Sequence, residues 1–125
     1  MKVGIPQWRD RVSPVFDVAS SLLVVDLAKG RELRREQRAL TAGDPIKRAR
    51  QVSQLGTEVL ICGAVSWPLE IALSAAGVRV IPFTCGTVEE VLSAFVNGKL
   101  TRSAFLMPGC CGRRRRLRAR RGRSR

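Results

Sequence analysis

Apolar residues along the chain gather in short runs separated by polar segments, and the runs predict the strands of a sheet. The first run, KVGIP, predicts a short strand that stops at Pro6. The run SSLLVVDL at 20–27 is almost continuously apolar and β-branched, which is typical of a strand buried on both faces. EVLICGAV and VRVIPFT, further along the chain, predict two more buried strands.

The segment RELRREQRAL is open to two interpretations. Its composition favours a helix, with Leu33 and Leu40 seven residues apart. Its position directly after AKG, where Gly30 can take a positive φ, favours the return arm of a β-hairpin. Charged side chains protect an exposed sheet edge from pairing with other chains. We therefore predict an edge strand.

Three helices are predicted from the residues that begin and end them. Each starts at a side chain that can cap backbone amides and ends at a glycine, which readily takes the left-handed conformation. The third start, TVEE, also has the spacing of a capping box. The predicted helices run from Asp44 to Gly56, from Ser66 to Gly77 and from Thr87 to Gly98.

The resulting order β-β-β-α-β-α-β-α predicts an α/β fold. A hairpin followed by alternating units gives a five-stranded mixed sheet with helices on both faces, and right-handed crossovers place the last two strands beside the first. This is a ribonuclease H-like, three-layer α/β/α architecture. We expect it to span residues 1–106 and to be followed, at 107–125, by a tail after a Pro-Gly break.

A ligand site is expected at the carboxyl ends of the strands, where the strand order reverses. Two of the connections there lead into helix N-termini, whose free amides and positive dipoles favour an anion. Arg9 and Arg11 add positive charge against the single acid Asp10, and the amides at Ser66 and Thr87 add donors. Ordinary solvated loops with ordinary caps are the alternative. The connections expected to meet are 7–11, 63–66 and 85–87.

The net charge of +13 belongs mostly to the tail, because residues 113–125 hold nine arginines and no acid. The rest of the chain has 14 basic and 10 acidic residues. Blocks of like charge are usually solvated and often act as interaction segments. Arg113, Arg114, Arg115 and Arg116 are candidates for weak, sequence-independent nucleic-acid binding or for recruiting an acidic protein partner. The tail has no aromatic residue for base stacking.

Four cysteines supply the reactive groups, and their spacing is not that of a disulfide framework. Cys62 and Cys85 each follow a predicted strand, where core packing is the main alternative to a role as ligand. Cys110 and Cys111 lie among arginines, which lower the pKa of a thiol and favour metal-binding thiolate. A redox-sensing thiol pair is a further alternative for these two. The thiols predict a reducing, cytoplasmic location.

Several classes of protein are disfavoured by what the sequence lacks. It has neither histidine nor tyrosine, and no cluster of acids that could hold the two metal ions of a nuclease. It has no phosphate-binding glycine loop, and no apolar run long enough for a secretory signal or a membrane span. We therefore predict a protein that is not an enzyme and has no contact with membranes.

Four segments together resemble the dinitrogenase iron–molybdenum cofactor biosynthesis family: MKVGIPQWRDRVSPVFDVASSLLVVDL, GTEVLICGAV, PLEIALSAAGVRVIPFTCGTVEEVLSAFVNGKL and MPGCCGRRRR. The resemblance covers the chain from Met1 to about Leu100. It implies a ribonuclease H-like fold and a protein that holds or carries metal–sulfur clusters, which are anionic. A related small protein, the orange protein, holds a molybdenum–copper sulfide cluster without covalent attachment.

The chain departs from the family pattern at one place. Many relatives read S-E-H-F-G-R-A where this chain has SPVFDVA, so that Val15 replaces a histidine, Asp17 a glycine and Val18 an arginine. The resemblance implies a carrier for a cluster of molybdenum with iron or copper, and a cofactor-accepting protein as partner. With no histidine available, three alternatives follow: thiols of Cys85, Cys110 and Cys111 supply the metal ligands, charge and amides alone hold the cluster, or this chain no longer binds clusters.

Overall fold

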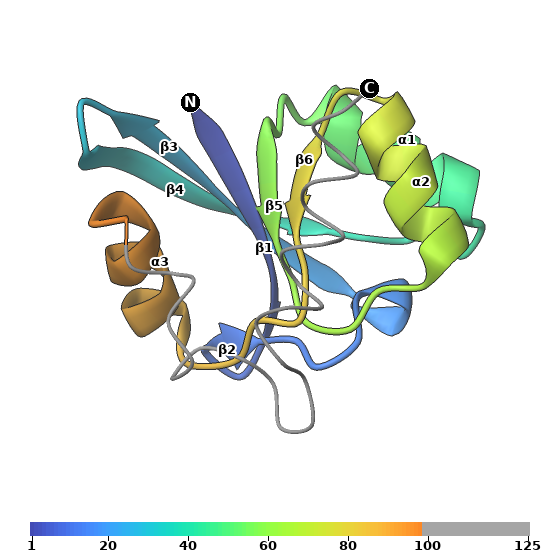
Figure 1. Ribbon diagram of the computed structural model, residues 1–125, viewed down its shortest axis with the longest axis horizontal. Coiled ribbons are helices and arrows are strands. Elements are labelled where there is room, and N and C mark those ends of the chain that lie inside the picture. The colour runs from blue at the N-terminus through green and yellow to red at the C-terminus, as the bar shows by residue number, and fades with distance from the viewer. Residues whose placement is uncertain (99–125) are drawn as a thin grey trace.

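The computed structural model describes residues 1–98, and Figure 1 shows a central sheet with helices on both sides. This arrangement confirms the predicted three-layer α/β/α fold. The strands are β1 (Lys2–Trp8), β2 (Arg11–Val12), β3 (Ser21–Ala28), β4 (Arg31–Ala39), β5 (Val59–Ile61) and β6 (Arg79–Ile81). The helices are α1 (Pro45–Gln54), α2 (Trp67–Ala75) and α3 (Val88–Val96), and a 3₁₀ turn, η1, covers Phe16–Val18.

The central strand is β1, and the main sheet has the order β4-β3-β1-β5-β6. β3 and β4 form an antiparallel hairpin beside β1, whereas β5 and β6 run parallel to it. Val3 pairs with Val25 on one side and with Val59 on the other. The two strands that follow helices therefore lie on the same side of the first strand, with β5 next to β1 and β6 beyond β5. The prediction from right-handed crossovers placed both of them beside the first strand.

Each face of the sheet has its own hydrophobic core. Side chains at alternate positions of a strand point to opposite faces, so the neighbours Leu22 and Leu23 of β3 belong to different cores. α1 and α2 cover one face through residues such as Val52 and Leu73. α3 covers the other, where Val91 is fully buried, and Figure 1 shows the helices on these two sides.

The sheet has six strands rather than the five predicted. β1 continues past Pro6 to Trp8, and the chain then turns back into β2, which pairs with the end of β1. The turn places Arg9 and Asp10 at φ values of 49° and 63°. Glycine or asparagine usually occupies such positions in two-residue hairpins, so the sequence carries no clear turn signal there. The predicted loop 7–11 is mostly strand.

The ambiguous segment is the edge strand β4, as predicted. Almost every residue of β4 is exposed, and charged side chains occupy most of its length. Arg35 on this strand binds two carboxylates, donating to Glu32 at 2.6 Å and to Glu89 of α3 at 3.0 Å. These hydrogen bonds raise the pKa of Arg35 and lower that of Glu89. The edge strand is thereby tied to the helix that covers it.

Candidate functional site

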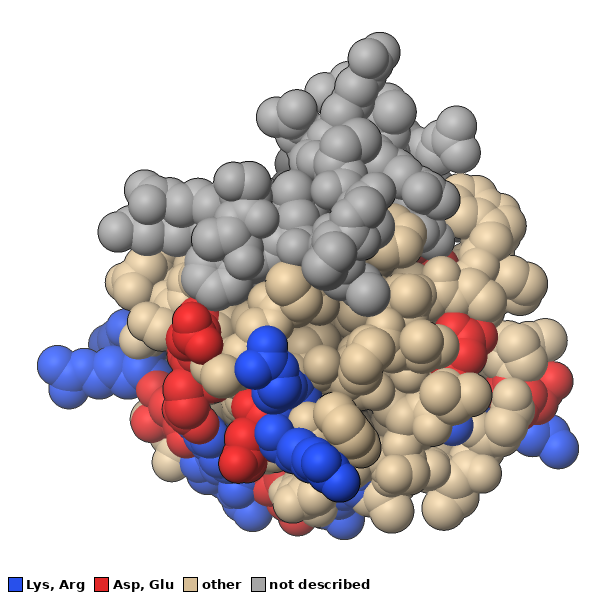
Figure 2. Space-filling view, turned by 90° about the horizontal axis from the view of Figure 1, so that it is seen from below, with Lys and Arg blue, Asp and Glu red and all other residues tan. Residues whose placement is uncertain are grey.

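The carboxyl ends of β1, β5 and β6 lie at one edge of the sheet, at the bottom of Figure 1. Figure 2 views the molecule from this side, where uncharged side chains form much of the described surface and charged ones gather mainly to one side. Exposed apolar side chains occur in the segments near this edge: Trp8, Val15, Val18 and Trp67. The edge therefore combines apolar surface with local charge.

Close backbone contact joins the connection after β5 to the segment after β2. The amide of Ala64 donates to the carbonyl of Pro14 at 2.8 Å, and the amide of Phe16 donates to the carbonyl of Ala64 at 2.8 Å. Gly63 permits this approach, since a Cβ atom there would lie 2.6 Å from the carbonyl oxygens of Ser13 and Pro14. The predicted connection 63–66 is therefore hydrogen-bonded to residues 14–16, which follow β2 and lie beyond the predicted connection 7–11.

The connection after β6 joins the same edge beside β2. The amide of Val12 donates to the carbonyl of Gly86 at 3.0 Å, and the amide of Val88 donates to the carbonyl of Asp10 at 2.9 Å. Arg11 and Thr87 lie directly opposite one another between these two bonds, in an antiparallel bridge. Such a pair does not share hydrogen bonds, and its side chains stand close together. The fold thus brings together two residues that the sequence proposed as ligand-binding.

The start of α3 has mixed electrostatics. Thr87 caps the helix, accepting from the amide of Glu90 at 3.2 Å, and its hydroxyl donates to the carboxylate of Glu90 at 2.7 Å. Glu89 and Glu90 in the first turn oppose an external anion, although Glu89 is paired with Arg35. Arg11 is the cation placed opposite Thr87, so it would carry most of the local attraction for a negatively charged ligand.

Ser66 differs from the sequence-based expectation of a free amide. It caps α2 as predicted, its hydroxyl accepting from the amide of Leu69 at 3.4 Å. Its own amide, however, donates to Oδ1 of Asp17 at 2.8 Å. Sequence reasoning missed Asp17, although an acid inside the otherwise apolar stretch VFDVA was a signal that its carboxylate has a specific partner.

Arg9 occupies the tip of the turn between β1 and β2. Its guanidinium lies 4.8 Å from the centroid of the Trp8 ring, a cation–π contact on the molecular surface. Trp8 is exposed to 53%. Arg9 therefore contributes long-range positive charge from a different position than Arg11.

The two described cysteines have different environments. Cys62 is fully buried in the core beneath α1 and α2, which confirms core packing for this residue. Cys85 is half-buried in the connection between β6 and α3. Near it the backbone is unusual, with Phe83 at a φ of 59° and Gly86 at 129°. A bulky residue in the left-handed region is rare, and the examples that occur cluster at functional sites.

Cys110, Cys111 and Arg113–Arg116 lie outside the described residues, as does the predicted domain end at 106. Within residues 1–98, no group of three histidine, cysteine, aspartate or glutamate side chains is placed to hold a metal ion. None of the helices in this part is long and apolar enough to cross a membrane.

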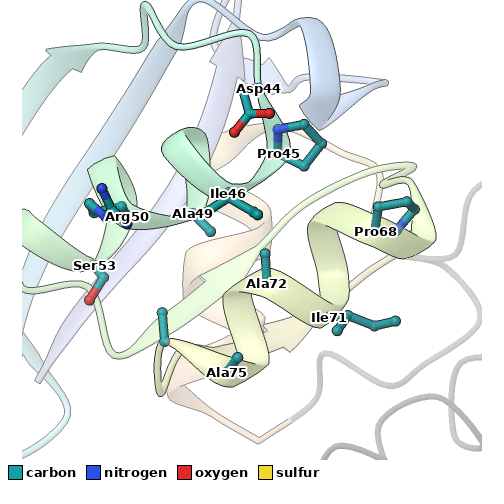
Figure 3. A pocket seen from close by; sticks show the side chains of 11 residues that line it. Asp44, Pro45, Ile46, Ala49, Arg50, Ser53, Pro68, Ile71, Ala72 and Ala75 are labelled. Carbon is teal, nitrogen blue, oxygen red and sulfur yellow. The ribbon is translucent and has the colours of Figure 1, made fainter.

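A groove of about 680 Å³ lies elsewhere, between α1 and α2 (Figure 3). Ile46 projects between the two helices above Ala49 and Ala72, and Pro68 and Ile71 line the α2 side. The lining is mostly apolar, and Arg50 is its one basic residue. Because an anion requires donors or positive charge to replace its hydration, this groove is a poor site for an anionic ligand.

Residues 1–98 match the family described as dinitrogenase iron-molybdenum cofactor. The chain belongs to this family. The match covers the whole described part of the chain and confirms the resemblance seen in the sequence. Among curated proteins, none matches this chain significantly.

Solved structures of the dinitrogenase cofactor family and its relatives have the same fold. The apo form of the orange protein from Desulfovibrio gigas is 27% identical, with a TM-score of 0.68 over 84% of this chain and 94% of that one. A NifB-like protein from Thermotoga is 29% identical, with a TM-score of 0.62 over 78% and 89%. A dinitrogenase-like protein from Methanocaldococcus jannaschii, 19% identical, has a TM-score of 0.64 over 80% and 91%.

Proposed function

We propose that this protein binds and carries an anionic metal–sulfur cluster at the carboxyl edge of its sheet. Membership of a family described by the iron–molybdenum cofactor supports a cluster of that general kind. The observation that carries the proposal is the pairing of Arg11 with Thr87 at the start of α3. It puts a cation beside a hydroxyl and a helix N-terminus, which together favour a negative ligand.

Each residue would make a different kind of interaction with the cluster. Arg9 and Arg11 attract the cluster, and the backbone amide at Thr87 donates to its sulfides. Cys85 supplies a thiolate from the neighbouring connection, since soft sulfur ligands suit copper, iron and molybdenum–sulfur chemistry. Cys110 and Cys111 would add two further thiolates from the tail. The cluster is cargo, containing molybdenum with iron or copper, and it is passed to an acceptor protein without chemical conversion.

Binding is tested on the full chain purified without oxygen. We expect near-stoichiometric molybdenum with copper or iron, and acid-labile sulfide, either as purified or after incubation with tetrathiomolybdate and copper or with iron and sulfide. Arg11→Ala should weaken loading about tenfold, the effect of losing one charge-assisted hydrogen bond. The matched control is Arg79→Ala, which removes an exposed arginine at the amino end of β6. Absence of metal and sulfide under all conditions would refute the proposal.

Nucleic-acid binding is the second candidate function, and it belongs to another class. The observation that favours it is the run of nine arginines at 113–125. Such a segment neutralises phosphates and releases counterions, which gives affinity that falls steeply with salt. In this case Arg113–Arg116 would bind, and the α/β domain would act as a scaffold.

A further inference from the structure

The N-terminus of α2 already holds an anion that belongs to the protein. Asp17 lies in η1, and its Oδ1 accepts from the amide of Ser66 at 2.8 Å. Amides in the first turn of a helix are the donors that bind external anions in other proteins. A carboxylate from the same chain now occupies this position. It is held there by the rigid backbone contacts between the segment after β2 and the connection after β5.

A buried guanidinium lies behind the same segment. Arg48 of α1 is 5% exposed, donates to the carbonyl of Ala19 at 2.7 Å and to that of Phe16 at 3.3 Å, and stacks on the Phe16 ring. Its Nε is buried and has no hydrogen-bond partner among the described residues. Burial lowers the pKa of Arg48, and the nearby charge of Asp17 partly opposes this effect. The environment of Asp17 therefore contains a helix amide and an incompletely satisfied cation.

We propose that Asp17 is an internal anion that closes the N-terminus of α2 to external anions and thereby directs an anionic ligand to Arg11 and Thr87. The inference rests on the proposed function and assigns a residue that determines where on the edge the ligand binds. A ligand at Ser66 would first have to displace a carboxylate that is tethered at high effective concentration. Once displaced, the carboxylate of Asp17 would also repel the anionic ligand.

The start of α3 is occupied differently. There the carboxylate of Glu90 accepts from the hydroxyl of Thr87, and Arg11 lies opposite to compensate negative charge. At α2 the internal carboxylate accepts directly from the backbone amide. The two helix starts thus differ in whether an arriving anion must break a hydrogen bond to the backbone.

The test follows the backbone amide of Ser66 by ¹⁵N–¹H NMR in the full chain while sodium molybdate is added at constant ionic strength. In the wild-type protein this amide should not respond. In Asp17→Ala the resonance of this amide should shift and saturate. The apparent affinity for molybdate should be at least about tenfold higher than that of any response in the wild-type protein, as expected for a regained charge-assisted hydrogen bond. Asp17→Asn keeps an acceptor without the charge and should respond more weakly. It provides a second variant if the alanine variant does not fold.

Asp10→Asn is the matched control, because it also removes one negative charge from this edge and asparagine tolerates the positive φ at that position. It should leave the Ser66 amide unresponsive. A Ser66 amide that responds equally in the wild-type protein, or that responds in neither Asp17 variant, would overturn the inference. Molybdate is the probe and no cluster is needed, so these results are independent of metal and sulfide loading. A failure of the proposed function is therefore distinguishable from a failure of this inference.

Discussion

Single residues determine whether the connections at the carboxyl edge of the sheet can pack against one another. Gly63 is needed for its lack of a side chain, because a Cβ there would lie 2.6 Å from two carbonyl oxygens. Asp17 matters for one hydrogen bond, to an amide 49 residues away. The local sequence signals at most that Asp17 has a partner. It does not show which neighbour either residue meets, because the fold brings that neighbour close.

At this scale we predict that Gly63→Ala is strongly destabilising. The added methyl would meet backbone rather than a flexible side chain, so the two connections must separate, at a cost of about 2–3 kcal/mol in the free energy of unfolding. Gly43→Ala is the control, because a Cβ there meets nothing within 4 Å. It should change the free energy by less than about 0.5 kcal/mol. Urea denaturation measures both, and equal effects would contradict the predicted clash.

At the scale of elements, the edge strand and its covering helix are linked by charge as well as by packing. Arg35 of β4 bridges Glu32 on its own strand and Glu89 of α3. The pair is largely exposed, Glu89 having a side-chain exposure of 72%. Solvent therefore screens it, and we expect only a small contribution to stability.

A double-mutant cycle of Arg35→Ala and Glu89→Ala should give a coupling free energy of about 0.2–1 kcal/mol at pH 7. The hydrogen bond from Arg35 lowers the pKa of Glu89 in the folded protein. A carboxyl with a lowered folded pKa contributes stability above its unfolded pKa and loses it as pH falls through the folded one. The coupling should accordingly disappear as the pH falls through the lowered pKa of Glu89. A coupling that persists in acid, measured by chemical denaturation, would refute this account.

At the scale of the whole molecule, the chain is a family domain followed by an arginine-rich segment. The family match ends at residue 98, and the aligned structures cover about four-fifths of this chain but nearly all of their own. The arginine-rich segment at 113–125 therefore lies beyond the residues that the family model matches. It is the feature on which the second candidate function depends.

Removal of residues 113–125 separates the two candidate functions. A chain ending at Gly112 keeps all four cysteines and should keep the cooperative unfolding transition of the full protein. If the tail binds nucleic acid, the truncated chain should lose affinity for RNA and DNA, and the full chain should show a steep decrease in affinity with salt. Fluorescence anisotropy over a salt series measures this. Equal affinities of the two chains would eliminate tail-mediated binding.

The elements that depend on local chemistry can be predicted from the sequence. Caps at Asp44, Ser66 and Thr87 and apolar runs for the buried strands are readable because each depends on residues a few positions apart. The sequence did not predict strand β2. The turn before it places arginine and aspartate at positive φ, where glycine or asparagine is the usual turn signal.

The arrangement of the candidate site, in contrast, depends on the folded chain. It set Arg11 opposite Thr87, buried Cys62 in the core, and gave the amide of Ser66 to Asp17. These pairings join residues dozens of positions apart, and they follow from strand order and close backbone contact rather than from local preference. Local pattern specifies which residues can donate, accept or carry charge. The packing of three connections at one sheet edge determines which of those groups stay available to a ligand.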